Sequence, residues 1–173
     1  MKNLMIFLIA LMPATLFAQN STTAFYSKYA GHDGFTAVNI SPKTFELIAS
    51  VDMNDEDLSV IKDITGVSIL VCEEDHGCTA AKAAQLTKEA YASIDSGYEE
   101  LLTIKENGTD LKILARSVSN GIINDLLIVG NDDGEFIYVN VTGKMDLKKL
   151  KELAGKVDID GFDHLKDIDT DKK

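Results

Sequence analysis

The alternation of apolar and polar positions is clearest in the second half of the chain. Four apolar-rich runs follow one another there, and short polar dipeptides that contain glycine separate them. The runs cover residues 98–106, 110–118, 122–129 and 135–142, and the dipeptides are Asn107-Gly108, Asn120-Gly121 and Asp133-Gly134. Asn-Gly and Asp-Gly adopt the positive φ angles that tight hairpin turns require. This half of the chain therefore predicts a four-stranded antiparallel meander.

The beginning of the first half predicts short elements. We expect a helical turn and a loop over residues 20–35, followed by a strand over residues 36–40. Ser41 and Pro42 are typical of a helix start, because a serine hydroxyl caps the first turn and proline fits its first position. A short helix with an apolar side should follow them.

The middle of the chain predicts two further helices around a strand. Residues 54–57 favour a helix start, because Asn54 is followed by three acidic residues in the first turn, with Ile64 on the buried stripe and Gly66 at the end of the helix. An apolar run over residues 67–72 predicts a buried strand, and the pattern over 79–96 predicts the longest helix. A final helix is expected to begin at Asp146, whose side chain can cap it.

Together these elements predict an α+β fold. It should contain a mainly antiparallel sheet with a C-terminal four-strand meander, and the helices should pack on one face. The length of 173 residues suits one domain, which we place at residues 19–157, followed by a polar acidic tail at 158–173.

The first residues have the pattern of a cleavable export signal. Lys2 supplies a positive start, residues 4–11 are almost entirely apolar, and Ala18 is a small residue at the expected cleavage site. A signal is favoured over a buried N-terminal helix because a polar stretch without helical period follows. We therefore expect residues 1–18 to be removed, and the mature protein to be periplasmic or secreted. No membrane span and no lipid anchor are expected, since no long apolar run follows the cleavage site and no cysteine lies near it.

The charge of the chain bears on its partners. The formal net charge is −11 at pH 7, and removing Lys2, the only charge in the signal, lowers it to −12. Binding to nucleic acid relies on clustered lysine and arginine, so a chain this acidic is not expected to bind it.

The densest cluster of reactive residue types lies at residues 72–78, between a predicted strand and a predicted helix. It holds the only two cysteines, Cys72 and Cys78, with Asp75 and His76 between them. One interpretation is a structural disulfide, which an oxidising compartment favours. A second is a pair of unpaired or buried thiols. A third is a redox site or a Zn²⁺ or Cu site formed by Cys72, His76 and Cys78, with Asp75 as a further ligand, although five intervening residues exceed the usual cysteine spacing.

Other candidate sites are weaker. His32 beside Asp33 could act as an orienting pair in acid–base chemistry, but the neighbouring glycines favour a surface turn. Residues 158–163 resemble a calcium loop only faintly, because counting back from Gly161 places Lys156 at the first ligand position. No sequence fingerprint of a catalytic or cofactor site is present, so we expect no enzyme activity and no cofactor.

Several segments carry a resemblance to a known family. They are FYSKY at 25–29, FTAVNIS at 35–41, YEELL at 98–102 and FIYVNVTGKMDL at 136–147. Over residues 25–154 the chain resembles the domain-of-unknown-function family 4252, small exported proteins of Gram-negative Bacteroidota-type bacteria. The resemblance implies an envelope location and supplies no catalytic residues. Many members look like lipoproteins, and this chain differs from them in lacking the lipid-bearing cysteine.

These observations favour an exported envelope protein that binds an unknown protein or envelope component without catalysing a reaction. Its sheet, its exposed loops or an edge strand would form the binding surface. The alternative is a metal-binding or thiol-active periplasmic protein that uses the Cys72–Cys78 loop. A carrier of small ligands would need an apolar cavity between the helices and the sheet.

Overall fold

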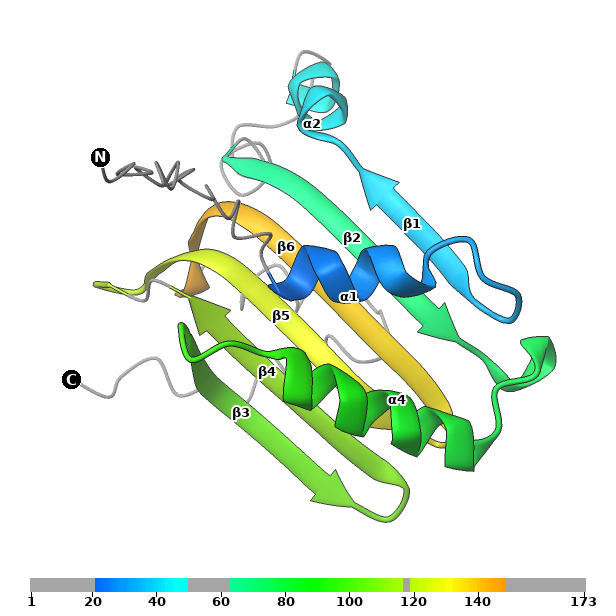
Figure 1. The fold of residues 1–173 in the computed structure, drawn as a ribbon. Helices are drawn as coiled ribbons and strands as arrows, with labels where there is room; N and C mark the ends of the chain where they lie inside the picture. The colour runs from blue at the N-terminus through cyan, green and yellow to red at the C-terminus, as the bar shows by residue number, and fades with distance from the viewer. Residues whose placement is uncertain (1–20, 50–62, 117–118, 149–173) are drawn as a thin grey trace, which may run out of the picture.

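The computed structural model describes residues 21–49, 63–116 and 119–148 (Figure 1). The strands are β1 Thr36–Ile40, β2 Ile64–Cys72, β3 Tyr98–Glu106, β4 Thr109–Arg116, β5 Ile122–Asp132 and β6 Glu135–Asp146. The helices are α1 Ser21–Tyr29, α2 Pro42–Ala49 and α4 Ala80–Ser93, with a 3₁₀ turn, η1, at Glu74–His76. The six strands form one antiparallel sheet in the order β1-β2-β6-β5-β4-β3. The predicted α+β class is therefore confirmed.

The predicted meander is formed by β3 to β6, each strand pairing with the next. Its hairpin turns contain the expected left-handed residues: Asn120 and Gly121 have φ angles of 52° and 76°, and Asp133 and Gly134 have 44° and 90°. Because these turns fix the register of the adjoining strands, the pairing in this half follows from local sequence.

The prediction for residues 64–66 was wrong. Ile64 and Gly66 were expected on a helix and at its end, but both lie in β2, where Gly66 pairs with Thr142 of β6. A Cβ atom at Gly66 would lie 3.1 Å from the Thr142 hydroxyl oxygen, so the glycine allows the two strands to approach closely. The start of that predicted helix lies outside the described residues, as do the export signal and the acidic tail.

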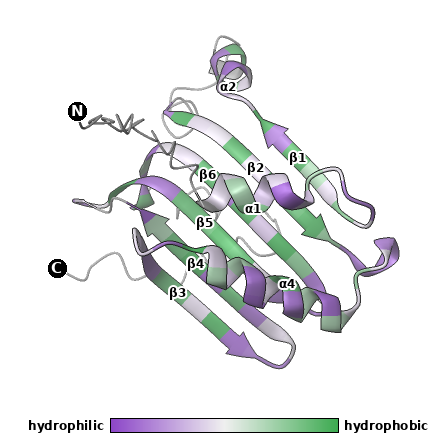
Figure 2. Ribbon diagram, viewed as in Figure 1, coloured by the Kyte–Doolittle hydropathy of each residue, from purple (hydrophilic) through white to green (hydrophobic). Residues whose placement is uncertain are grey.

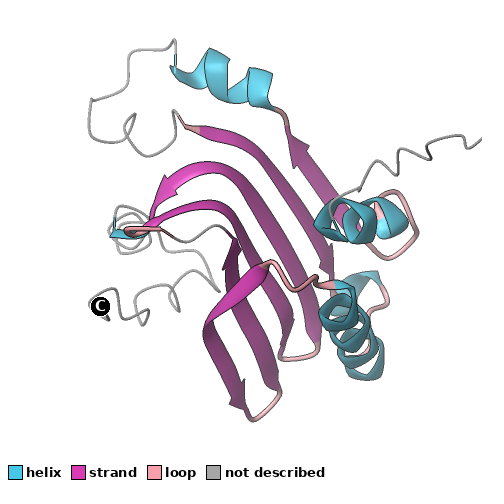
Figure 3. Cartoon of the chain, turned by 60° about the vertical axis from the view of Figure 1, so that its left-hand side comes forward, coloured by secondary structure: helices cyan, strands magenta, loops and turns pink. Residues whose placement is uncertain are grey.

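Helices α1 and α4 lie on the same face of a strongly curved sheet (Figure 3). Thr79 caps α4, since its hydroxyl oxygen accepts a hydrogen bond from the Lys82 backbone N–H at 3.2 Å. The helix ends at Ser93, before the predicted end at residue 96. None of the described helices is long and apolar enough to cross a membrane.

Apolar side chains pack on both faces of the sheet, and hydrophobic bands alternate with polar ones along the strands in Figure 2. The cluster between the sheet and helices α1 and α4 includes Phe25, Leu70, Leu86, Leu127, Phe136 and Tyr138. The cluster on the opposite face includes Leu111, Ile113, Ile123, Ile128, Val139 and Met145. Leu147, the first apolar residue of the predicted final helix, packs against this second cluster.

Candidate binding site

The first strand is the most exposed strand of the sheet. Residues Thr36 to Asn39 are all exposed and Ile40 is half-buried, and Val38 is 41% exposed. Among the described strands β1 pairs only with β2, so it forms one edge of the sheet. Alternate N–H and C=O groups of an edge strand point away from the sheet and can pair with another chain.

The opposite edge of the sheet, strand β3, differs from β1 in its chemistry. It carries the charged residues Glu99, Glu100, Lys105 and Glu106, and its pairing with β4 is interrupted by a register shift after Glu100. Charges and bulges are the usual means by which proteins prevent an edge strand from pairing with other chains. The β1 strand has no charged residue and pairs with β2 in continuous register over its five residues.

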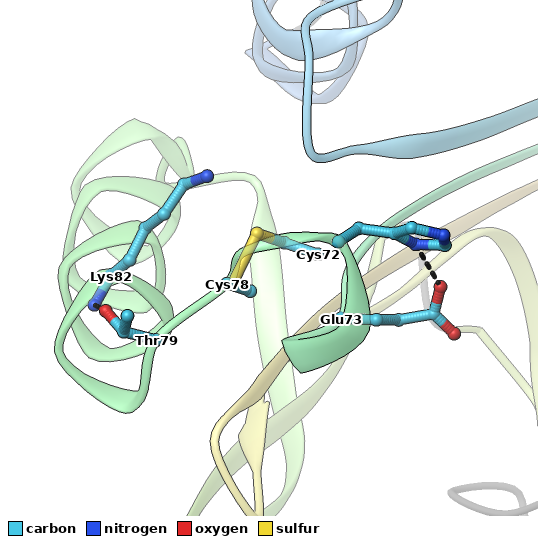
Figure 4. The surroundings of a disulfide bond; sticks show 6 residues. Cys72, Glu73, Cys78, Thr79 and Lys82 are labelled. Carbon is cyan, nitrogen blue, oxygen red and sulfur yellow. Dashed lines mark hydrogen bonds and ion pairs between the residues drawn. A yellow bond between two sulfur atoms is a disulfide. The ribbon is translucent and has the colours of Figure 1, made fainter.

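The Cys72–Cys78 loop lies beside the beginning of β1. The two cysteines form a disulfide, as the first interpretation of the sequence predicted, and their Cα atoms are 5.4 Å apart (Figure 4). Cys72 ends β2 and Cys78 precedes the cap of α4, and both side chains are buried in the cluster beneath the helices. The disulfide therefore ties the end of β2 to the start of α4.

The same loop holds the residues that the metal interpretation requires. In the disulfide the two sulfur atoms bond to each other, so neither is available as a thiolate ligand. The His76 ring nitrogen Nδ1 instead lies 3.1 Å from a carboxylate oxygen of Glu73, and both side chains are partly exposed. Within the part of the chain that the structure describes, no three His, Cys, Asp or Glu side chains are grouped so that they could hold a metal ion.

The turn before β1 packs against the disulfide loop. Gly34 has a φ angle of +83°, and a Cβ atom at this position would lie 2.9 Å from the backbone oxygen of His76. The Lys82 ammonium group lies 5.0 Å from the centre of the Phe35 ring. His32 and Asp33, the other candidate pair from the sequence, lie exposed in this turn. The disulfide loop and α4 therefore position the start of β1.

Acidic side chains surround the start of β1. Asp33 lies in the turn before the strand, and Glu73, Glu74 and Asp75 lie in the disulfide loop, where Glu74 and Asp75 are exposed. We refer to these four residues as the acidic loops. Glu73 pairs with His76, while the Lys82 side chain is half-buried over Phe35. The surface at this end of the strand is therefore negative.

A second polar feature lies on the helix-covered face of the sheet. Asp125 and Asn140 are 6% and 7% exposed, and the Asn140 side-chain N–H donates to the Asp125 carboxylate at 2.5 Å. Burial raises the pKa of Asp125, while the nearby Tyr98 hydroxyl, the hydrogen bond from Asn140 and the charge of Arg116 oppose that rise. The Arg116 guanidinium lies 4.4 Å from the Tyr98 ring centre. Burial raises the pKa of Tyr98, which the charge of Asp125 also raises. The Tyr98 hydroxyl nevertheless has no hydrogen-bond partner of normal geometry among the described residues.

The sequence alone did not predict the buried Asp125–Asn140 pair or the exposed edge at β1. Asp125 and Asn140 lie within the apolar-rich runs 122–129 and 135–142, and their position there was the available signal for a buried polar pair. The exposed edge could not be recognised, because residues 36–40 read as a strand without any indication of its place in the sheet.

A family model described as "Domain of unknown function (DUF4252)" matches residues 26–153. No curated protein and no solved structure matches the chain.

Proposed function

We propose that this chain, which belongs to the DUF4252 family, is an exported envelope protein that acts as a binding module and not as an enzyme. The module accepts an extended segment of a protein partner at the free edge of β1. The partner segment becomes a seventh strand of the sheet, with main-chain hydrogen bonds supplying affinity and side-chain contacts supplying specificity.

The observation that carries this proposal is the exposure of β1 without the features that protect an edge. Residues 36–39 are all exposed, whereas β3 at the other edge carries charges and a register shift. If β1 served only the fold, charged residues like those of β3 would be expected in it, since an unprotected edge favours aggregation.

The anchoring of β1 to the rest of the sheet supports the same function. β1 pairs with β2 over five residues, and β2 in turn pairs with β6 near the centre of the sheet. The disulfide and the packed turn at Gly34 hold the start of the strand. A preorganised edge loses little conformational entropy when it binds, so more of the interaction energy contributes to affinity.

The proposal of export rests on the predicted signal at residues 1–18 and is compatible with a disulfide, because disulfides persist in oxidising compartments. N-terminal analysis of protein recovered from a periplasmic fraction tests it. A chain that begins at Gln19 is expected, and an uncleaved chain in the cytoplasm would contradict it.

Binding at the edge is tested by site-specific photocrosslinking in the native host. A photoreactive amino acid replaces Val38 on β1 or, as a matched control, Glu99 on β3, which lies at the opposite edge and on the same face of the sheet. We expect Val38 to crosslink to one defined segment of one partner, identified by mass spectrometry, and Glu99 not to do so. Excess unlabelled protein should compete for the crosslink, whereas an excess of the Val38→Asp variant should not. Equal labelling from both edges would exclude a specific role for β1.

A further inference from the structure

We infer that the segment accepted by β1 presents an apolar residue opposite Val38 and carries lysine or arginine at its C-terminal end. This inference rests on the proposed function and adds the chemistry of the partner. It follows from the two faces of β1 and from the charge at one end of the strand.

The apolar residue follows from a row of side chains that crosses the whole sheet. Directly paired residues on antiparallel strands point to the same face, and the pairs Val38–Ile69, Ile69–Val139, Val139–Ile128, Ile128–Ile113 and Ile113–Leu102 link all six strands. Val38 is the exposed end of this row. An apolar side chain on an added strand would cover Val38 and extend the row by one position.

The other face of β1 favours small or polar side chains. Asn39 lies on that face, and its side-chain N–H donates to the Ser68 hydroxyl oxygen at 3.0 Å. The next residue on this face is Ala37, which pairs with Leu70. The partner segment should therefore alternate polar, apolar and polar residues over the length of β1.

The positive charge follows from the acidic loops. They lie at the Thr36 end of β1, and within them Glu74 and Asp75 are exposed and form no ion pair with a described residue. Every strand pair in the sheet is antiparallel, so an added strand is expected to run antiparallel to β1 as well. Its C-terminal end would then pass the acidic loops, where basic side chains gain favourable Coulomb energy and like charges are rejected.

A second copy of this chain fits the edge less well than a basic segment. Each chain has a net charge of −11, and two such chains repel one another unless specific contacts compensate. Self-association through β1 is nevertheless a distinct outcome that the experiment below detects.

The probe is a fluorescent nine-residue peptide, Thr-Val-Thr-Val-Thr-Gly-Lys-Lys-Lys, titrated with the purified protein and followed by fluorescence anisotropy. Two control peptides carry three glutamates in place of the lysines, or carry the three lysines at the N-terminal end. We expect the first peptide to bind about fivefold more tightly than either control at about 0.1 M salt, the effect of a few exposed ion pairs. The preference should disappear at about 1 M salt, where charges are screened beyond about 3 Å.

Two variants separate the edge from the charge. Val38→Asp should abolish binding of the lysine peptide, although its added negative charge alone would favour a cationic ligand. The triple variant Asp33→Asn, Glu74→Gln, Asp75→Asn should still bind but should lose the preference for C-terminal lysines. The matched control removes three acids from β3 (Glu99→Gln, Glu100→Gln, Glu106→Gln) and should retain the preference.

The outcomes distinguish this inference from the proposed function. If the lysine and glutamate peptides bind equally, and Val38→Asp still abolishes binding, then the inferred positive charge of the partner segment is wrong, whereas binding at the β1 edge is supported. If no peptide binds, or if Val38→Asp binds as well as the original chain, both are overturned. A homodimer that Val38→Asp dissociates, with no peptide bound, would assign the edge to a second copy and also overturn the inference.

Discussion

Reduction of the Cys72–Cys78 disulfide should destabilise the protein by a calculable amount. The bond closes a loop with a sequence separation of 6, and the chain-entropy relation for a loop of this length gives about 2 kcal/mol. Both cysteine side chains are buried in the native state, so reduction leaves their packing largely in place and removes mainly the restriction of the unfolded chain. For a chain of this size, we expect a decrease in Tm of about 4–8 °C.

The assay is thermal unfolding followed by far-UV circular dichroism, with and without dithiothreitol. The double variant Cys72→Ala, Cys78→Ala is the control, since its unfolding midpoint should be lower in both conditions and insensitive to the reductant. An unchanged midpoint of the original chain on reduction would refute the reasoning, because the bond would then not stabilise the protein by restricting the unfolded chain. Free thiols in the native protein, together with a bound metal that His76→Ala removes, would instead support the metal-binding alternative.

Three further predictions concern the fold that supports the edge. Because burial raises the pKa of Asp125 in the folded state, its contribution to stability is present at low pH and is lost as the pH rises through that pKa. Asp125→Asn should therefore raise the urea midpoint at pH 7 and leave it unchanged below about pH 3.5. An equal effect of the substitution at both pH values would contradict the burial of the charge. Gly34→Ala should cost more stability than Gly31→Ala, since both residues have positive φ angles but only Gly34 would bring its new Cβ atom against a backbone oxygen. Each substitution costs about 1–2 kcal/mol for the left-handed conformation. Equal losses of stability in thermal melts would rule out the contact at Gly34. Tyr138→Phe should cost about 1 kcal/mol by removing the hydrogen bond to the buried Thr22 carbonyl oxygen, and a denaturation midpoint that does not change would show that this bond is not important.

The hairpins show why so much of the C-terminal half was predictable. Asn120-Gly121 and Asp133-Gly134 have the backbone preferences that a tight turn requires, whatever surrounds them. Each turn sets the register of the strands beside it, and the apolar alternation then decides which side chains face inward. The pairing of β5 with β6 consequently depends on residues that are close in the sequence.

The start of β2 could not be predicted from local sequence. Ile64 and Gly66 follow an acidic helix start and read as the end of that helix, yet they pair with β6 residues about 80 positions away. Such a pairing depends on the surface that β6 offers and on the close approach that Gly66 permits, and neither is visible in a local window. The disulfide could be predicted as one of several interpretations, but its place beside β1 could not.

The sequence by itself determined the α+β class, the meander and the presence of one cysteine-containing loop, because periodicity and turn residues act over a few positions. Only the tertiary structure decided that residues 36–40 form an exposed edge, that the disulfide loop supports this edge, and that Asp125 and Asn140 meet in the interior. These features arise from contacts between distant segments, whose free energy depends on how the whole sheet is assembled and buried.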